Sequence, residues 1–357
     1  MKTTKETRIL ILIGAALCVL AIIAGINLIR ERKRSSIIWY VEKGLEERWA
    51  RVLRETRPPE SVNLIRVWDG DETPNGEAIP EPGILITTRP RKNREKAAVY
   101  YRLSYDLEYQ GAIVLAVDPW MVFRKHTDPE LTVKRVYSEA GRSGADKTGV
   151  LLIPGKDPAS VQAWTARLIK AIPGALPAGE TPDIHFDVTI DINLWREQEG
   201  KLFSANIFPR GSKTYTWQDV FYRLMSSETA WVYAPLSAIR RYTNFRKAIL
   251  VAAPFPEPDI GRHSLQAALL WAVPLGSPEE QSQMEQAIAW LKKPETQTVI
   301  ADSLEWIPAD PYGKPYDPVS LKSHRNWLTA EYIYEVSAVK TAGTGTVDSR
   351  KTSSVSR

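Results

Sequence analysis

Cysteine is nearly absent from this 357-residue chain, in which Cys18 is the only one. A single thiol cannot form a disulfide within the chain, and Cys18 lies in an apolar stretch near the N-terminus. The rest of the chain therefore contains no disulfide, no thiolate nucleophile and no cysteine-ligated metal. A cysteine-free domain suits an oxidising compartment without requiring one.

Motifs of common enzyme classes are also missing. The sequence has no H-E-x-x-H metal motif and no G-x-S-x-G nucleophile elbow. Residues 141–148, GRSGADKT, fall short of a phosphate-binding loop, because Asp146 replaces the second glycine and would repel a phosphate. The four histidines are scattered, which favours surface or hydrogen-bonded histidines over ligands: His126, His185, His263 and His324. We therefore expect no enzyme, no cofactor and no metal.

The one long apolar run lies close to the N-terminus, at residues 9–29, with Asn27 as its only polar side chain. About 20 apolar residues cross a ~30 Å hydrocarbon core as a helix, so the run predicts a transmembrane anchor after a short tail at 1–8. A cleaved signal peptide is the alternative, but its apolar region is usually only about 7–15 residues long. Leu17 argues against lipidation of the following cysteine, because a lipoprotein site normally has a small residue there.

The net charge of +5 comes entirely from the region around this run. Residues 1–34 contain seven Lys and Arg against two Asp and Glu, and the remaining chain contains 40 of each sign. These basic residues would contact anionic lipid head groups, and they do not indicate a nucleic-acid partner. Their numbers before and after the span nearly balance, so the positive-inside rule does not fix the orientation.

The most informative stretch is 111–125, GAIVLAVDPWMVFRK. Its first part, 111–117, carries no charge and is rich in β-branched residues, which is typical of a strand buried on both faces. Asp118 and Pro119 interrupt the run, because proline lacks a ladder donor and keeps the preceding residue extended. A second apolar run follows at 120–123. This pattern predicts a strand that crosses from one sheet to another.

The remaining chain alternates between helical and extended patterns, which indicates the α/β class. The expected helices cover 36–55, 157–172, 216–226 and 277–293, with a second short helix beginning at 294. The expected strands cover 61–68, 84–88, 149–153, 183–193, 248–256 and 269–274, with a strand and turn at 229–237.

In the strand at 183–193, polar residues alternate strictly with apolar ones. The row formed by His185, Asp187 and Asp191 could hold a metal or a polar ligand. It could equally be the solvent face of a half-covered sheet, and the alternation alone explains the pattern. We favour the solvent face.

A second informative block runs from 228 to 333. It contains TAWVYAPLS at 229–237, AILVAAPFP at 248–256, PETQ at 294–297 and WIPA at 306–309. In order and spacing, this block and the stretch 111–125 resemble the extracellular solute-binding proteins of bacterial ABC transporters, which include sugar- and maltodextrin-binding members. The chain departs from that group at Glu305, where a glycine is common, and in a short, partly basic first lobe.

The resemblance implies a two-lobed, periplasmic-binding-protein-like α/β fold with crossover strands, preceded by the transmembrane helix. A juxtamembrane helix at 30–60 would lead into a domain at 61–340, followed by a tail at 341–357 that is rich in Ser, Thr and Gly and should be disordered. Lobe 1 would cover about 61–118 and 262–310, and lobe 2 about 119–261 and 311–340.

The function implied by the resemblance is binding of a carbohydrate or other small polar solute in the interlobe cleft. The solute would then pass to ABC permease subunits in the cell inner membrane, with the soluble domain in the periplasm or outside the cell. The chain has twelve tryptophans, and aromatic rings can stack on sugar faces, although buried tryptophans more often serve packing. The resemblance places six residues nearest the cleft: Asp118, Trp120, Trp231, Tyr233, Arg240 and Trp306.

An alternative function stays open. The fold could have lost its solute and could act as a structural or protein-interaction module at the membrane. The short first lobe and the basic segment at 89–96 favour this alternative, whereas the crossing strand and the number of tryptophans favour solute binding.

Overall fold

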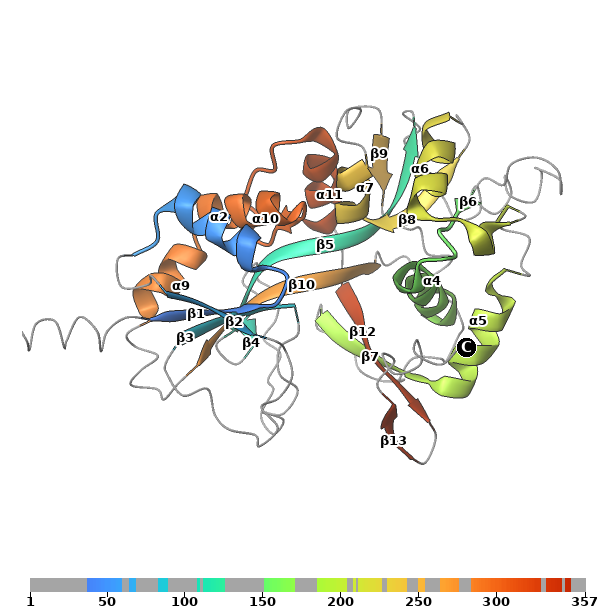
Figure 1. Cartoon of the computed structure of the whole chain (residues 1–357), viewed down its shortest axis with the longest axis horizontal. Coiled ribbons are helices and arrows are strands. Elements are labelled where there is room, and N and C mark those ends of the chain that lie inside the picture. Colours follow the sequence, from blue (N-terminus) through green and yellow to red (C-terminus); the bar gives the residue numbers. More distant parts are fainter. Residues whose placement is uncertain are drawn as a thin grey trace, which may run out of the picture. The chain divides into compact units, whose positions relative to one another are not determined.

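The structure is a computed structural model of the whole chain, and its elements are labelled in Figure 1. It describes residues 37–59, 64–68, 83–88, 108–109, 112–125, 151–170, 185–203, 208–209, 211–226, 230–242, 250–253, 264–275, 284–328, 332–341 and 344–347. The predicted anchor at 9–29 lies outside these residues. Within the described ranges, no helix has the length and apolarity needed to cross a bilayer.

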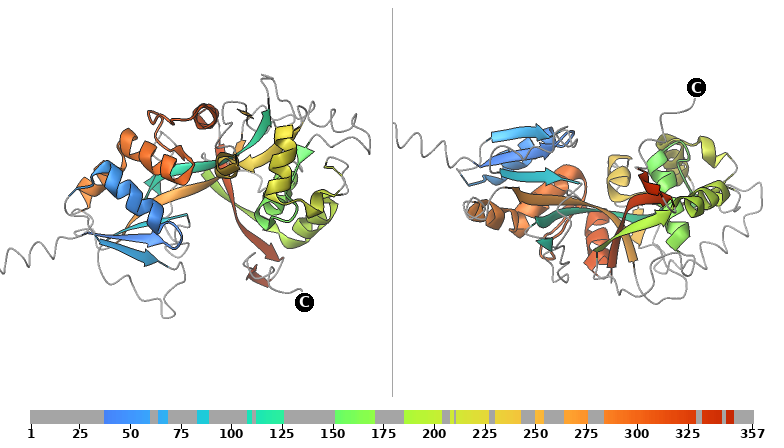
Figure 2. Two further views of the ribbon diagram at one scale, coloured as in Figure 1. Left: turned by 45° about the horizontal axis from the view of Figure 1, so that its top comes forward. Right: turned by 90° about the horizontal axis from the view of Figure 1, so that it is seen from below.

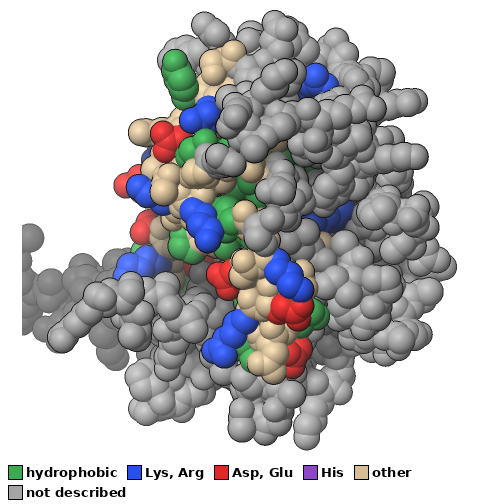
Figure 3. Space-filling model, turned by 90° about the vertical axis from the view of Figure 1, so that its right-hand side faces the viewer, with side chains coloured by type: hydrophobic (Ala, Val, Ile, Leu, Met, Phe, Trp, Pro, Cys, Tyr) green, Lys and Arg blue, Asp and Glu red, His purple; other side chains and the backbone are tan. Residues whose placement is uncertain are grey.

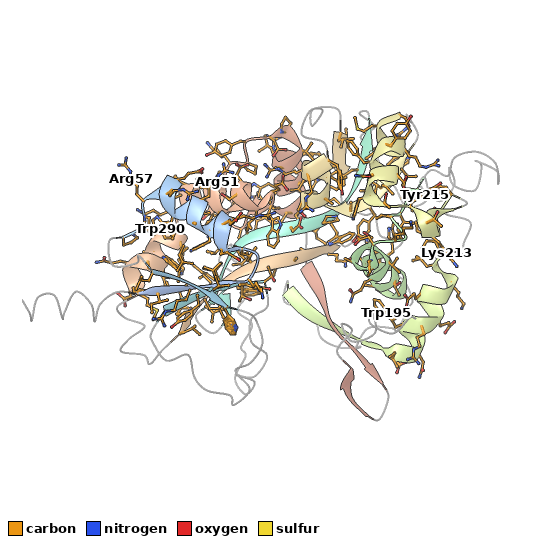
Figure 4. All side chains as sticks on the ribbon, viewed as in Figure 1. Arg51, Arg57, Trp195, Lys213, Tyr215 and Trp290 are labelled. Atoms are coloured by element: carbon orange, nitrogen blue, oxygen red, sulfur yellow. The ribbon has the colours of Figure 1, made fainter. Side chains whose placement is uncertain are left out.

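The chain divides into two compact units, 1–86 with 273–290, and 87–272 with 291–357. In the first unit, β1 (Ile38–Glu42) lies between β2 (Leu64–Trp68) and β3 (Gly83–Thr87) and is parallel to both. Two helices, α2 (Glu46–Thr56) and α9 (Glu285–Leu291), pack against β1 of this sheet. The Trp39 ring centroid lies 5.2 Å from that of Trp49 and 5.8 Å from that of Trp290, which Figure 4 labels. This aromatic cluster packs the two helices against β1.

The predicted helix at 36–55, and with it the juxtamembrane helix at 30–60, is wrong in its first part. Residues 38–42 form strand β1, and the helix begins only at Glu46. All five residues from 37 to 41 are buried, which the stripe of a surface helix cannot achieve but the central strand of a parallel sheet can. The helical spacing of apolar residues predicted the structure correctly only from Trp49 onward. In α2, Trp49 and Val52 are the buried residues.

The second unit is organised around β5 (Ala112–Lys125), a strand of 14 residues. Its first half pairs antiparallel with β10 (Ser264–Leu275) and β11 (Ile307–Pro308), and its second half with β8 (Trp231–Pro235) and β9 (Leu250–Ala253). Figures 1 and 2 show β5 and β10 lying side by side as long strands. The change of partners falls between Pro119, opposite Ala267, and Trp120, opposite Pro235. The prediction of a strand that crosses between sheets is confirmed.

The remaining elements of the second unit are β4 (Glu108–Tyr109), β6 (Leu151–Leu152), α4 (Pro158–Lys170), β7 (His185–Asp191), α5 (Ile192–Leu202), η1 (Ser212–Thr214), α6 (Trp217–Ser226), α7 (Leu236–Tyr242), α10 (Pro294–Leu304), α11 (Pro318–Leu328), β12 (Tyr332–Thr341) and β13 (Thr344–Val347). Among them, β6, α4, β7, α6 and α10 correspond to predicted strands and helices. Strand β6 is parallel to β8, and β7 is parallel to β12. Helices α5, α7 and α11 and strands β4 and β12 were not predicted. The expected helix start at 277 lies outside the described residues.

The polar row of the strand at 183–193 ends in a helix cap. Asp191 accepts hydrogen bonds from the backbone N–H groups of Asn193 at 2.8 Å and Leu194 at 3.2 Å, so its carboxylate begins α5. The side chains at 185–190 lie outside the described part. In the described part of the chain, no group of three His, Cys, Asp or Glu side chains is arranged to hold a metal.

The predicted disordered tail at 341–357 is wrong at Thr344–Val347, which form β13 antiparallel to β12. The register pairs Val339 with Val347 and Lys340 with Thr346. Composition predicted disorder, but β-branched threonine and valine favour the extended backbone, and a neighbouring strand supplies the ladder.

Charges of both signs are interspersed over the described part of the face shown in Figure 3. This distribution matches the balance of 40 basic and 40 acidic residues after position 34.

Candidate functional site

The site predicted around the crossing strand lies in the second unit, and Asp118 is at its centre. This side chain is 6% exposed and lies next to the point where β5 changes partners. Asp118 Oδ1 accepts a hydrogen bond from the Ser237 backbone N–H at 3.0 Å, and Oδ2 accepts one from Ser237 Oγ at 2.6 Å. Ser237 is the second residue of α7. The carboxylate therefore ties the crossing strand to the start of the helix that follows β8.

Burial raises the pKa of Asp118 to about 6, because removal from water disfavours the charged form more than the two Ser237 hydrogen bonds favour it. Glu305 raises the pKa further by charge repulsion, and Arg241 lowers it by attraction. The carboxyl group therefore has a pKa of about 6, although its side chain is almost completely buried.

Three predicted aromatic residues lie together on one side of β5. The Tyr233 ring centroid lies 5.4 Å from that of Trp120 and 5.1 Å from that of Trp164, and its hydroxyl donates to Gln266 Oε1 at 2.9 Å. Trp231 and Tyr233 are completely buried in one hydrophobic cluster. Trp120 packs against this cluster and stays partly exposed. Of these three rings, only Trp120 offers surface to a solute.

Arg240 is the centre of a buried ionic group. Its Nη2 donates to Asp302 Oδ1 at 2.7 Å, and its Nε lies 3.3 Å from Asp317 Oδ2. Its Nη1 donates to the Trp306 carbonyl oxygen at 3.5 Å. Asp317 also accepts a hydrogen bond from the Ser320 N–H at 2.9 Å, at the start of α11. Arg240 therefore joins α7, α10 and the beginning of α11.

Five of the six predicted residues are thus buried and bonded or packed within the protein, and Trp120 alone is half-buried. The structure brings Asp118, Trp120 and Tyr233 to the region where β5 changes partners, and Trp306 precedes β11, which pairs with β5 at Val117. Arg240 bonds to the Trp306 carbonyl oxygen from α7. No contact with a solute follows from these positions alone, so the ligand-binding assignment stays a prediction.

The partners of these residues were not predicted from the sequence. Gln266 could have been found from the sequence, because it is the only polar side chain of strand β10 after Ser264. Ser237 carried a weaker signal, since Ser residues often begin helices. Nothing in the sequence indicates that Asp302 and Asp317 pair with Arg240, because tertiary packing decides which helices lie next to Arg240.

Comparison with known proteins places the fold. No protein-family model and no curated protein matches the sequence. Among solved structures, the apo form of RafE from Streptococcus pneumoniae is 12% identical, with a TM-score of 0.57 over 84% of this chain and 88% of that one. The bacterial solute receptor AcbH, described as having an exclusive preference for β-D-galactopyranose, is 11% identical, with a TM-score of 0.60 over the same shares. Maltose-bound MalE3 from T. maritima is 15% identical, with a TM-score of 0.52 over 82% and 88%.

The chain therefore has the two-lobed α/β fold of the solute-binding proteins of ABC transporters, as its sequence predicts. Of these structural neighbours, AcbH is described as a solute receptor, and MalE3 is bound to maltose. At this level of identity, the likeness defines the fold.

Proposed function

We propose that this chain is a solute-binding protein of an ABC transporter, without enzymatic activity, that binds a carbohydrate or other small polar solute between its lobes. The observation that carries the proposal is the exchange of strand partners along β5, between Pro119 and Trp120. A strand that continues from one sheet into another is the connection about which two lobes can close on a ligand. The fold shared with RafE, AcbH and MalE3 supports the same function.

Within this proposal, Trp120 contacts the solute, and the other predicted residues hold Trp120 and its surroundings in place. Its partly exposed ring could stack on the apolar face of a sugar, and its inner side packs against Tyr233. Asp118 and Arg240 then act as positioning residues, because their polar atoms are already bonded to Ser237 and Asp302.

The location and partners are part of the proposal. Residues 9–29 anchor the chain in the cell inner membrane, and the domain at 61–340 faces the periplasm or the cell exterior, where it delivers its solute to ABC permease subunits. The parts proposed to close are lobe 1 (61–118, 262–310) and lobe 2 (119–261, 311–340), a division that differs from the two compact units of the structure.

Thermal unfolding of the full chain with a panel of sugars tests the proposal. The chain is kept in a polyoxyethylene detergent, because a glucoside or maltoside would itself compete as a ligand. A sugar at 100 times its dissociation constant should stabilise the folded chain by about 2.7 kcal/mol. The variant Trp120→Ala should lose most of this gain, whereas Tyr222→Ala, which removes a ring that is 75% exposed on α6, should retain it.

A second candidate function is supported by the burial of five of the six predicted residues. In that case, the fold has lost its solute and acts as a structural or protein-interaction module at the membrane. Unchanged melting temperatures across galactose, maltose, raffinose and longer oligosaccharides would overturn solute binding and favour this module.

A further inference from the structure

The loop at residues 310–317, between β11 and α11, exposes two tyrosines, and we call it the tyrosine loop. Tyr312 is 78% exposed and Tyr316 is 74% exposed. Among the described residues, only Leu64, Val67 and Tyr222 are other large hydrophobic side chains with comparable exposure. Two such rings within five positions are unusual for a surface that serves only solvation.

The backbone of the tyrosine loop is held rigidly. The N–H groups of 310 and 314 donate to Gln297 Oε1 at 2.7 Å and to Thr298 Oγ1 at 3.2 Å. The N–H of Tyr312 donates to Asp310 Oδ1 at 2.7 Å, and that of Gly313 donates to the Asp310 carbonyl oxygen at 3.1 Å. Residues 311 and 315 are prolines. Every backbone N–H from 310 to 314 is therefore bonded, so the backbone that carries the Tyr312 ring is already ordered, which lowers the entropic cost of binding there.

A groove of about 730 Å³ lies between the tyrosine loop and helices α10 and α11. We call it the tyrosine groove, and its walls are formed by Pro294, Thr298, Pro311, Tyr312, Tyr316 and Leu321, among others. Its volume falls in the range of about 300–1,000 Å³ that is usual for small-molecule sites. Leu321 and Leu328 line it as well, so its walls combine apolar side chains and tyrosine rings with polar groups.

The tyrosine groove is positively charged. Lys314 and Arg325 line it and are exposed, and Glu295 is its only acid. Within the ranges that the structure describes, neither cation forms an ion pair. His324, at the base, adds no charge at pH 7, because burial lowers its pKa below the usual value. The groove thus combines two presented rings with two cations that have no acidic partner.

We propose that the tyrosine groove is a second binding site, for an acidic saccharide such as an oligomer of uronic acids. Tyrosine rings stack on the apolar faces of sugar rings, and Lys314 and Arg325 would pair with the carboxylates. None of the six residues predicted near the cleft lines this groove. The site is therefore independent of the proposed solute site, and it can be present even if that site is not.

Calorimetric titration of the full chain with trigalacturonate tests this site, with neutral maltotriose as the matched probe. Trigalacturonate should bind, and its affinity should fall as salt is raised. The double variant Tyr312→Ala/Tyr316→Ala should weaken binding by about tenfold or more, and Lys314→Gln/Arg325→Gln should weaken it and remove most of the salt dependence. All four side chains are exposed, so both variants should fold, which their melting temperatures check.

Tyr222→Ala is the control, because it removes an equally exposed ring on a different helix, and it should leave trigalacturonate binding unchanged. Binding of trigalacturonate that survives both double variants would overturn the proposal, as would the absence of any binding by the unmodified chain. A loss of maltotriose binding in Trp120→Ala, with trigalacturonate binding intact, would show that the two sites are separate.

Discussion

Replacing Asp118 by asparagine should stabilise the chain at neutral pH, although it removes a charged hydrogen-bonding group. The carboxylate is buried, and its two partners are both atoms of Ser237. Asparagine has nearly the same shape, so its Oδ1 can still accept from the Ser237 N–H, and its amide can donate to Ser237 Oγ. The substitution therefore keeps the link to α7 and removes the cost of burying a charge.

The magnitude follows from the pKa. A rise from 3.8 to about 6 in the folded chain corresponds to roughly 3 kcal/mol at about 1.36 kcal/mol per pKa unit. Because the folded state binds the proton more tightly than the unfolded state, the stabilising contribution is fully present below pH 3.8 and is lost as the pH rises through about 6. The advantage of Asp118→Asn over the unmodified chain should therefore grow by about 2–3 kcal/mol between pH 4 and pH 7.5.

Urea unfolding of both chains at several pH values, followed by tryptophan fluorescence, measures this difference. Asp219→Asn is the matched control, because hydrogen bonds from Thr216 lower the pKa of exposed Asp219. Its stabilising contribution is present above the usual pKa and is lost as the pH falls, so its pH dependence should have the opposite sign. A difference between Asp118→Asn and the unmodified chain that stays constant from pH 4 to pH 7.5 would refute the argument from burial.

Three further predictions concern residues that join elements of the second unit, each measured by urea unfolding. Arg240→Gln should destabilise the chain by about 3 kcal/mol, since it leaves the carboxylates of Asp302 and Asp317 without their cation. A change below about 1 kcal/mol would contradict this, because it would mean that water already solvates these carboxylates. Tyr233→Phe should cost about 1–2 kcal/mol, because it leaves the buried Gln266 oxygen without its donor, and an unchanged midpoint would contradict this. Gly313→Ala should cost about 1–3 kcal/mol, because a Cβ there would lie 2.6 Å from the Pro308 side chain, whereas Gly200→Ala on α5 meets no atom within 4 Å and should be neutral or stabilising.

Local patterns located the elements well where one short-range rule dominated. The apolar run broken at Asp118 and Pro119 predicted the crossing strand, because proline restricts its own residue and its neighbour whatever the rest of the chain does. Asp157 predicted the start of α4 for a similar reason, and its carboxylate accepts the Ser160 N–H at 3.2 Å. The first helix was misplaced because its apolar spacing also fitted a central strand, and only the neighbours β2 and β3 decide between the two.

The sequence by itself determined the α/β class and the crossing strand, because runs of apolar residues and prolines act within a few positions, and the membrane anchor at 9–29 stays a prediction. Tertiary structure alone decided what the predicted site residues do. Asp118 meets Ser237 across 119 positions, Tyr233 meets Gln266 across 33, and Arg240 meets Asp302 across 62. Burying a polar group requires a partner, and the packing of distant elements chooses that partner. The same packing left Tyr312 and Tyr316 exposed on the loop between β11 and α11, which no periodicity in the sequence indicates.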